Sequence, residues 1–207
     1  MEYLHWKEEK VSDNFSDFYN KGFVFTRIDK GTMHQTRSVR IDLSRFELSS
    51  ENRRILKKVE GIELKEIALP FSNYHWSLGK LAKDFYDTKF GDGIFSAQKV
   101  KEILTSSESN FNLLLNYSDI GFAICYLNNE ILHYSYPFYD LTKAPKDMGM
   151  GMMTKAIVWA KEKGLKYVYL GSLQRPGDVY KLQFEGLEWF DGTVWSKDLE
   201  AAKKELK

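Results

Sequence analysis

The hydrophobic pattern of the C-terminal half alternates between apolar runs and short polar breaks. Three apolar runs, at residues 111–117, 121–128 and 131–139, are separated by gaps such as Asn-Asn-Glu. Gaps of this length favour hairpins and therefore an antiparallel meander. A glycine-containing loop, a helical pattern and a further apolar run at 167–170 follow. Since a helical crossover joins parallel strands, this last run is predicted to lie parallel to the strand before the loop. The helix is predicted to bury a stripe formed by Met153, Ala156, Ile157 and Ala160.

The rest of the chain gives shorter predicted elements. Strands are predicted at 22–28 and 62–69, and helices at 51–60, around Leu78–Phe85 and from Ser96 to about Leu104. The stretch 29–47 is polar and basic, with Arg37, Arg40 and Arg45 close together, and no element is predicted there. Towards the C-terminus the pattern predicts a short helix over 175–184, a hairpin at Asp191-Gly192 and a charged helix after Ser196.

Composition narrows the class of protein. The chain has 207 residues, of which 43% are hydrophobic and 15% aromatic, so it can bury a core. Its net charge is +1, which does not indicate nucleic-acid binding through bulk charge. The single cysteine, Cys125, excludes an internal disulfide framework and a cysteine-based metal site, and no metal is predicted. Without a signal peptide or an apolar run of bilayer length, we expect a cytoplasmic protein that does not enter membranes.

The glycines between the third apolar run and its helix predict a phosphate site. They form the pattern Lys146-x-x-Gly149-x-Gly151. Glycines allow a ligand to approach the backbone, and the first amides of a helix attract anions. The candidate donor-binding residues are Lys146, Gly149, Met150, Gly151 and, on the following strand, Leu170. The alternative is an ordinary turn from strand to helix, with the neighbouring methionines as adaptable packing.

The order of these elements resembles that of the GNAT acyltransferases. The family's Arg/Gln-x-x-Gly-x-Gly loop is matched with Lys146 in the first position, and Val-Tyr180-Lys-Leu-Gln-Phe is similar to its Tyr-Lys-x-Gly-Phe region. The resemblance implies an α/β, GNAT-like acyltransferase fold whose mixed central sheet, an antiparallel meander plus a parallel pair, is flanked by helices. It also implies that the tyrosine protonates the leaving group.

A narrower resemblance, to the arginyl-tRNA–protein and leucyl-tRNA–protein transferases, extends over most of the chain. It rests on Tyr-Pro-Phe-Tyr139-Asp140, Gly-Leu-Lys-Tyr-Val-Tyr-Leu-Gly171, Val-Tyr180-Lys181-x-x-Phe184, Glu188-Trp-Phe-Asp-Gly-Thr-Val-Trp195, Arg37-Ser-Val-Arg40 and Phe46-x-x-Ser49-x-x-Asn-Arg53-Arg54. Three departures stand out. The family's N-terminal cysteines are absent, Gly151 makes the loop closer to that of acyl-CoA enzymes, and Ser172 replaces a large residue. We expect an N-terminal lobe over 1–60 and a GNAT-like domain over 61–207, or one compact unit.

Both resemblances imply attack of an amine on an activated carbonyl. This reaction needs donors for an oxyanion and a proton for the leaving group. Tyr180 is the candidate acid, Lys181 a candidate partner of a donor phosphate or carboxylate, and Asp140 a candidate base. Backbone amides of 168–171 are placed for the oxyanion. The alternatives are a core tyrosine, a surface lysine and a turn aspartate, and His133 is expected to be a packed core histidine.

The donor implied by the narrower resemblance is aminoacyl-tRNA, and the acceptor is a protein N-terminus. Arg37, Arg40, Arg53 and Arg54 are the candidate contacts to tRNA phosphates, although scattered surface arginines would look the same. No tightly bound cofactor is expected. Two alternatives remain open: an N-acetyltransferase that uses acetyl-CoA, and a non-catalytic binding module of the same fold.

Overall fold

The computed structural model describes residues 3–206, which form two compact units built from separate stretches of the chain. Unit 1 combines Met1–Ser49, Asn128–His133 and Ala160–Lys207, and unit 2 combines Ser50–Leu127 and Tyr134–Trp159. The expected lobe boundary at residue 60 stays a prediction.

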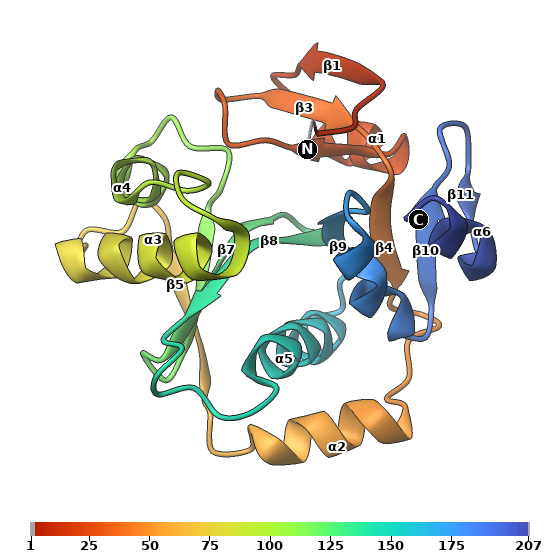
Figure 1. Ribbon diagram of the computed structural model, residues 1–207. Helices are drawn as coiled ribbons and strands as arrows, with labels where there is room; N and C mark the ends of the chain where they lie inside the picture. Colours follow the sequence, from red (N-terminus) through yellow and green to blue (C-terminus); the bar gives the residue numbers. More distant parts are fainter. Residues whose placement is uncertain (1–2, 207) are drawn as a thin grey trace. The chain divides into compact units, whose positions relative to one another are not determined.

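The elements follow the chain as coloured in Figure 1. Unit 1 contains β1 (Lys7–Lys10), α1 (Phe15–Asn20), β2 (Phe23–Phe25), β3 (Thr32–Gln35), β4 (Ser38–Asp42), β9 (Tyr167–Ser172), the 3-10 helix η1 (Pro176–Gln183), β10 (Leu187–Phe190), β11 (Trp195–Ser196) and α6 (Leu199–Lys204). Unit 2 contains α2 (Ser50–Lys58), β5 (Leu64–Ala68), α3 (Trp76–Phe90), α4 (Ala97–Thr105), β6 (Leu113–Tyr117) and β7 (Gly121–Leu127). The strand β8 (Ile131–Tyr139) and the helix α5 (Met148–Glu162) each have residues in both units.

The main sheet has eight strands in the order β11-β10-β4-β9-β8-β7-β6-β5. The pairs β10–β11, β10–β4, β4–β9, β5–β6 and β6–β7 are antiparallel. The strands β8 and β9 run parallel, with Ile131 opposite Tyr167 and His133 opposite Tyr169. A separate three-stranded sheet has the order β1-β3-β2. The predicted fold class, a mixed α/β fold with an antiparallel meander and a parallel pair flanked by helices, is confirmed.

In unit 2 the helix α5 packs on the meander. The hydroxyl of Tyr117 on β6 donates to the carbonyl oxygen of Met152 at 3.0 Å. Gly121 on β7 leaves room for the side chains of Met148 and Met152, since a Cβ there would come within 2.9 Å of each. The predicted apolar stripe of α5 is buried. Met148, Met152 and Met153 therefore pack in the core, as expected, whereas Met150 is only half-buried.

Two further helices cover an aromatic cluster in unit 2. The ring of Phe85 on α3 lies 4.7 Å from that of Tyr139 on β8, and Phe95 lies 5.3 Å from Tyr136. The side chain of Ser96 accepts a hydrogen bond from the Lys99 amide and caps α4, as predicted. These contacts hold the end of β8 from which the chain runs towards α5.

The core of unit 1 is centred on a buried tyrosine of α1. The ring of Tyr19 contacts Phe25 at 5.8 Å and Tyr169 at 4.7 Å, and its hydroxyl lies 2.9 Å from Nδ1 of His133. His133 is 1% exposed. Burial and, to a lesser extent, the charge of Lys181 lower the pKa of His133 to about 3, so the imidazole is neutral. The expectation of a packed core histidine is confirmed.

The structure corrects two sequence expectations. The stretch 29–47 contains β3 and β4, and β4 is a central strand between β10 and β9. Arg40 on β4 is buried in an ion pair. Because arginine usually lies at the surface, the sequence did not indicate a buried strand here. The second correction concerns the glycine loop. The helix begins at Met148, so Gly149 and Gly151 lie inside its first turn.

The predicted hairpin at Asp191-Gly192 is confirmed by the pairing of Phe190 with Trp195. The short helix after residue 175 is also confirmed, as the 3-10 helix η1. Among residues 3–206, none of the helices is long and apolar enough to cross a membrane.

Candidate functional site

The N-terminal end of α5 is the first part of the candidate site. Asp147, with φ of 66°, precedes the helix, and its carbonyl oxygen accepts from the amide of Gly151 at 2.9 Å. Gly149 and Met150 occupy the next helical positions, where backbone amides point along the axis out of the helix. The first turn of a helix favours negative charge, so this end of α5 is suited to an anion.

Three basic side chains surround this helix end. Nζ of Lys58 lies 2.5 Å from the carboxylate of Asp147. This hydrogen bond, followed by the charges of Lys58, Lys146 and Arg54, holds the pKa of Asp147 below its ordinary value. The helix end therefore has three cationic side chains and two carboxylates, Asp147 and the Glu51 that pairs with Arg54. An incoming phosphate would compete with Asp147 for Lys58.

The two glycines of this turn have different surroundings. A Cβ on Gly151 would lie 2.7 Å from both methyl carbons of Val59, which follows α2. A Cβ on Gly149 would meet only the Tyr139 ring, at 3.5 Å, an ordinary contact distance. Close packing between α2 and α5 thus accounts for Gly151. Packing does not require a glycine at position 149, and a role of Gly149 in ligand binding stays a prediction.

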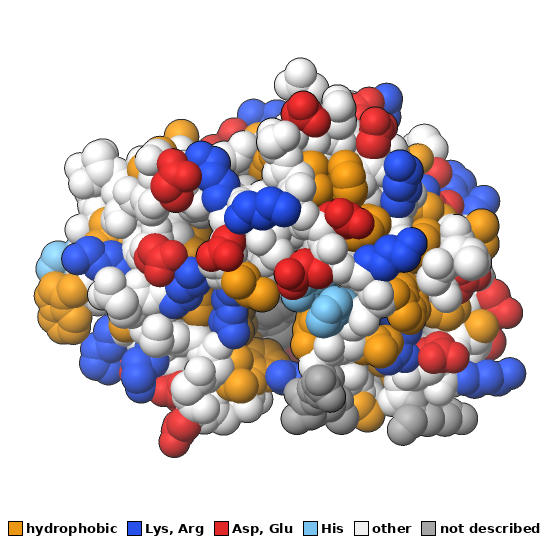
Figure 2. All heavy atoms as spheres, turned by 90° about the horizontal axis from the view of Figure 1, so that it is seen from above, with side chains coloured by type: hydrophobic (Ala, Val, Ile, Leu, Met, Phe, Trp, Pro, Cys, Tyr) orange, Lys and Arg blue, Asp and Glu red, His pale blue; other side chains and the backbone are white. Residues whose placement is uncertain are grey.

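The exposed face of α2 adds more positive charge to unit 2. Arg53, Arg54 and Lys57 are all exposed. Arg54 is paired with Glu51 through its Nη2, and its Nε donates to the same carboxylate at 2.7 Å. Lysine and arginine side chains are interleaved with acidic ones on the face shown in Figure 2, in line with the net charge of +1. Arg53, Arg54 and Lys57 thus give α2 an exposed basic face.

The second part of the candidate site lies in unit 1, where β9 leads to η1. Tyr180 on η1 is 41% exposed, and its ring centroid lies 5.8 Å from Nζ of Lys181. Leu170 on β9 is 3% exposed. The structure thus presents the Tyr180 side chain at the surface, which does not match the alternative of a core tyrosine.

Lys181 is buried, contrary to the alternative of a surface lysine. Its Nζ donates to the carbonyl oxygen of Ser172 at 2.8 Å and lies 3.2 Å from Oδ1 of Asp178. The ammonium group is thus engaged within unit 1. No sequence pattern pointed to Asp178 or Ser172 as its partners, although Asp178 stands three residues before Lys181, a spacing that meets on one face of a 3-10 helix.

Asp140, the candidate base, organises the turn after β8. Its Oδ1 accepts from the amide and hydroxyl of Thr142 at 2.9 and 2.6 Å, and Nζ of Lys143 lies 3.2 Å from Oδ2. These hydrogen bonds, with that of Thr142 first, lower the pKa of Asp140 to about 2. A carboxylate with this pKa is a weak base at neutral pH, so the geometry favours the role of a turn residue.

The two N-terminal candidate arginines are engaged inside unit 1. Nη1 of Arg37 donates to the carbonyl oxygen of Glu205 at 2.5 Å. Nε of Arg40 donates to Glu188 at 2.9 Å, and its guanidinium lies 4.0 Å from the ring centroids of both Tyr167 and Trp195. Arg40 is 8% exposed. Of the four candidate arginines, only Arg53 and Arg54 present exposed side chains.

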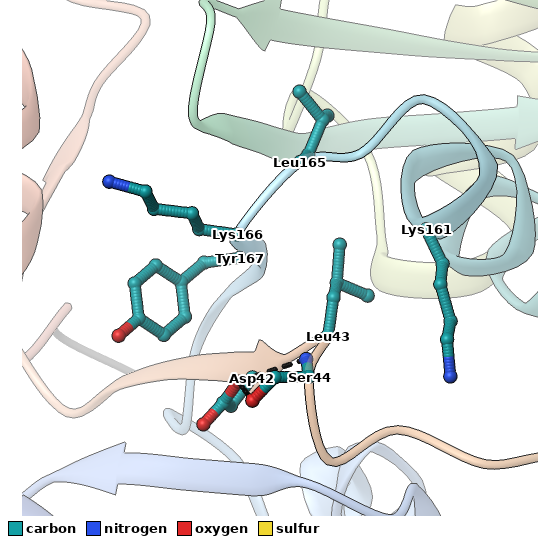
Figure 3. A pocket seen from close by; sticks show the side chains of 7 residues that line it. All are labelled: Asp42, Leu43, Ser44, Lys161, Leu165, Lys166 and Tyr167. Carbon is teal, nitrogen blue, oxygen red and sulfur yellow. Dashed lines mark hydrogen bonds between the residues drawn. The ribbon is translucent and has the colours of Figure 1, made fainter.

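A pocket with a volume of about 380 Å³ lies in unit 1 and is shown in Figure 3. Asp42, Leu43, Ser44, Lys161, Leu165, Lys166 and Tyr167 line it, and none of them is a predicted site residue. The side chains of Lys161 and Lys166 extend away from each other in the picture, and each pairs with a carboxylate, Glu47 and Glu130. Its cations are thus neutralised locally, and the pocket adds no chemistry to the site.

His5, Glu8 and His34 are a group of the described residues with atoms close enough for a metal ion. Nε2 of His34 lies 2.7 Å from the Glu8 carboxylate, and the two imidazoles stack at 4.3 Å with 15° between their planes. Parallel stacked rings do not direct their in-plane lone pairs at one ion between them. Stacking and the hydrogen bond account for the arrangement.

The predicted site residues therefore fall into two groups. Lys146, Gly149, Met150 and Gly151 lie in unit 2 with the exposed arginines of α2, and Leu170, Tyr180 and Lys181 lie in unit 1. In unit 2 the charges of Lys58, Lys146 and Arg54 act on Asp147, and in unit 1 Lys181 is bound to Ser172 at the end of β9. The meeting of the two groups around one donor stays a prediction.

The fold defines the class: a mixed α/β protein in which a meander, a helix and a parallel strand follow one another. No family model matches the chain. Its sequence is similar to proteins named aspartate/glutamate leucyltransferase: that of Ruegeria pomeroyi is 27% identical over 76% of this chain and 60% of its own length. The Dinoroseobacter shibae protein is 28% identical over 76% and 61%, and a Stenotrophomonas maltophilia protein is 33% identical over 37% and 31%.

The chain spans about three-fifths of the length of the two relatives that it matches most extensively. Among solved structures, L-PGS from Bacillus licheniformis is similar with a TM-score of 0.50 and 15% identity, over 92% of this chain and 66% of that one. This likeness concerns the fold alone. A GCN5-related glucosamine N-acetyltransferase region of a fungal enzyme gives a TM-score of 0.46 at 10% identity, over 85% of this chain and 21% of that one.

Proposed function

We propose that this protein transfers an aminoacyl group from aminoacyl-tRNA to the N-terminal amine of another protein. The observation that supports this most directly is the similarity, over about three-quarters of the chain, to proteins named aspartate/glutamate leucyltransferase. Those names favour leucine as the transferred group and an N-terminal aspartate or glutamate as the acceptor. They do not favour arginine, the other amino acid that the sequence resemblance leaves open.

In the proposed reaction, the acceptor amine forms a bond to the carbonyl carbon of the aminoacyl ester. The ester C–O bond breaks, the amine loses a proton and the departing ribose oxygen gains one. The exposed hydroxyl of Tyr180 is the proposed donor of that proton. The amide of Leu170 or of a neighbouring residue on β9 would stabilise the oxyanion. Asp140 has no part in this scheme, because its carboxylate is held in the turn.

The positive helix end of α5 would bind phosphates at the acceptor end of the tRNA. Lys58 and Lys146 are placed beside the amides of the first turn, and Arg53 and Lys57 extend the basic surface along α2. Such contacts fix a nucleic acid in position without reading its sequence. Arg37 and Arg40 are left out of this surface, because both guanidinium groups are engaged within unit 1.

The test is a transfer assay with radiolabelled leucyl-tRNA, arginyl-tRNA or acetyl-CoA as donor. The acceptors are peptides that differ only in their first residue: aspartate, glutamate, arginine or lysine. The expected result is one added leucine on the peptides that begin with aspartate or glutamate, and none on the same peptides with an acetylated N-terminus. If acetyl-CoA is the only donor that supports transfer, the second candidate, an N-acetyltransferase, replaces this proposal. Gly149 in the first turn of α5 favours that candidate, because a glycine there lets a pyrophosphate approach the backbone.

A further inference from the structure

The buried ammonium group of Lys181 links the candidate acid to the strand that precedes it. The Lys181 side chain is only 10% exposed, and its Nζ donates to the carbonyl oxygen of Ser172, the last residue of β9. A buried ammonium is strongly unfavourable unless it is paired and hydrogen-bonded. The carboxylate of Asp178, 3.2 Å away, supplies the counter-charge.

Asp178 extends this link to the start of η1. Its second oxygen, Oδ2, accepts from the backbone amides of Gln174 and Arg175, at 2.8 and 3.0 Å. One carboxylate therefore holds the segment that enters η1 and also binds the lysine in the middle of η1. Through Ser172, both are attached to β9.

The geometry of a 3-10 helix then determines where Tyr180 points. With three residues per turn, Asp178 and Lys181 lie on the same face. That face is turned inward, since Lys181, taken as a whole residue, is 8% exposed. Tyr180 lies about a third of a turn away and is 41% exposed, as is its neighbour Val179 at 46%. Burying the lysine thus directs the tyrosine outwards.

We propose that Lys181 is a positioning residue that acts through Tyr180. Its ammonium group attaches η1 to the end of β9, so that the tyrosine hydroxyl is held at a set place relative to the backbone amides of that strand. The inference rests on the proposed function, in which Tyr180 donates the proton and β9 stabilises the oxyanion. It changes the role expected for Lys181 from contact with the donor to orientation of the acid.

The test is a double-mutant cycle on transfer kinetics with Tyr180→Phe and Lys181→Met. Methionine keeps the length of the side chain and removes the charge. We expect Lys181→Met to lower kcat on the order of 10- to 100-fold with KM nearly unchanged, because a small displacement of a catalytic group has an effect of this size. In the Tyr180→Phe background the same substitution should lower kcat no further. If Lys181→Met lowers kcat equally in the unmodified chain and in Tyr180→Phe, or leaves kcat unchanged, the proposal is overturned.

Lys161→Met is the matched control, because Lys161 also donates from Nζ to a backbone carbonyl oxygen, that of Phe46, and not to a residue of β9 or η1. Its kcat should remain that of the unmodified chain. If Lys181→Met does not fold, Asp178→Asn replaces it in the cycle, since it removes the counter-charge and retains an oxygen for the backbone amides.

Amide hydrogen exchange separates failure of this inference from failure of the proposed function. Peptides that span residues 174–184 should exchange on the order of 10-fold faster in Lys181→Met, whether or not the chain transfers an aminoacyl group. If no donor supports transfer but exchange accelerates, the proposed function fails and the attachment of η1 stands. Unchanged exchange refutes the attachment itself.

Discussion

At the scale of single residues, unit 1 contains several charged or titratable groups that are withdrawn from water. Arg40 and Lys181 are each 8% exposed, and each is paired with a carboxylate, Glu188 and Asp178. His133 remains neutral because burial lowers its pKa. In each case the buried polar atom has a partner that sequence alone does not reveal. Knowing which residue is the partner shows whether the buried group has a structural or a catalytic role.

Arg40→Met is expected to destabilise the protein by about 3 kcal/mol, the lower end of the range for breaking a buried ion pair. Glu188 would lose the guanidinium of Arg40 and keep only Arg45, whose Nη2 lies 2.5 Å from Oε1. Urea unfolding measures the change. The control Arg54→Met, at an exposed position, should leave the urea midpoint unchanged. The double variant Arg40→Met/Glu188→Leu should recover part of the stability that Arg40→Met loses. An unchanged midpoint for Arg40→Met would contradict the structural role.

His133 should contribute to acid sensitivity. Its pKa of about 3 in the folded chain is below the ordinary value of 6.5, so between these values the unfolded chain binds a proton that the folded chain does not. Stability should therefore decrease as the pH falls from about 6.5 towards 3, by up to about 1.4 kcal/mol per pH unit from this group. The measurement is the free energy of unfolding of the chain and of His133→Asn from pH 7 to pH 4.5. If both lose stability equally, His133 is not the source.

At the scale of elements, the contact between α2 and α5 decides how the glycine pattern is interpreted. Gly151 faces Val59 so closely that a methyl group would not fit, whereas Gly149 has ordinary space around it. A pattern that resembles a phosphate loop thus contains one glycine required for packing. The ligand-binding interpretation rests on Gly149, the first-turn amides and the nearby basic side chains.

The two glycines should therefore respond differently to alanine. Gly151→Ala should destabilise the protein by about 1–3 kcal/mol through overpacking, and Val59→Ala in the same chain should restore part of this loss. Gly149→Ala should be neutral or stabilising by up to about 1 kcal/mol, as expected for alanine in a helix, yet it should weaken binding of the donor. Thermal unfolding and donor affinity, measured on the same proteins, separate the two effects. Similar losses of stability at both positions would contradict this distinction.

At the scale of the whole molecule, the net charge of +1 conceals a local basic surface. The exposed basic residues of α2 and Lys146 lie in unit 2, where Glu51 and Asp147 neutralise part of their charge. Binding of a polyanion would then depend on this surface and not on bulk charge. The chain also spans only about three-fifths of the length of the relatives that it matches most extensively.

Removing two charges from α2 should weaken tRNA binding and reduce its salt dependence. For Arg53→Gln/Lys57→Gln we expect the slope of log affinity against log salt to become shallower by about 1 to 2, as two phosphate contacts would give. The matched control is Lys80→Gln/Lys83→Gln on α3, which removes two exposed lysines of the same unit. A slope equal to that of the unmodified chain would place the tRNA elsewhere.

Much of the fold could be predicted from local pattern. The meander, the α5 stripe, the cap at Ser96, the hairpin at Asp191 and the parallel strand β9 all follow from periodicity and turn chemistry, which act over a few residues. The strands β3 and β4 could not be found in this way. Their buried polar residues, such as Arg40 and His34, are compatible with a sheet only because distant partners compensate for their burial.

The sequence by itself determined which residue types were available for chemistry: a tyrosine followed by a lysine, glycines near a helix start and several arginines. Only the tertiary structure decided which of them are exposed. It placed Tyr180 at the surface and Lys181 inside, engaged Arg40 with Glu188, and set Gly151 against Val59. The physical reason is that burial and charge pairing depend on residues far apart in the chain, and their contacts form only when the strands and helices pack.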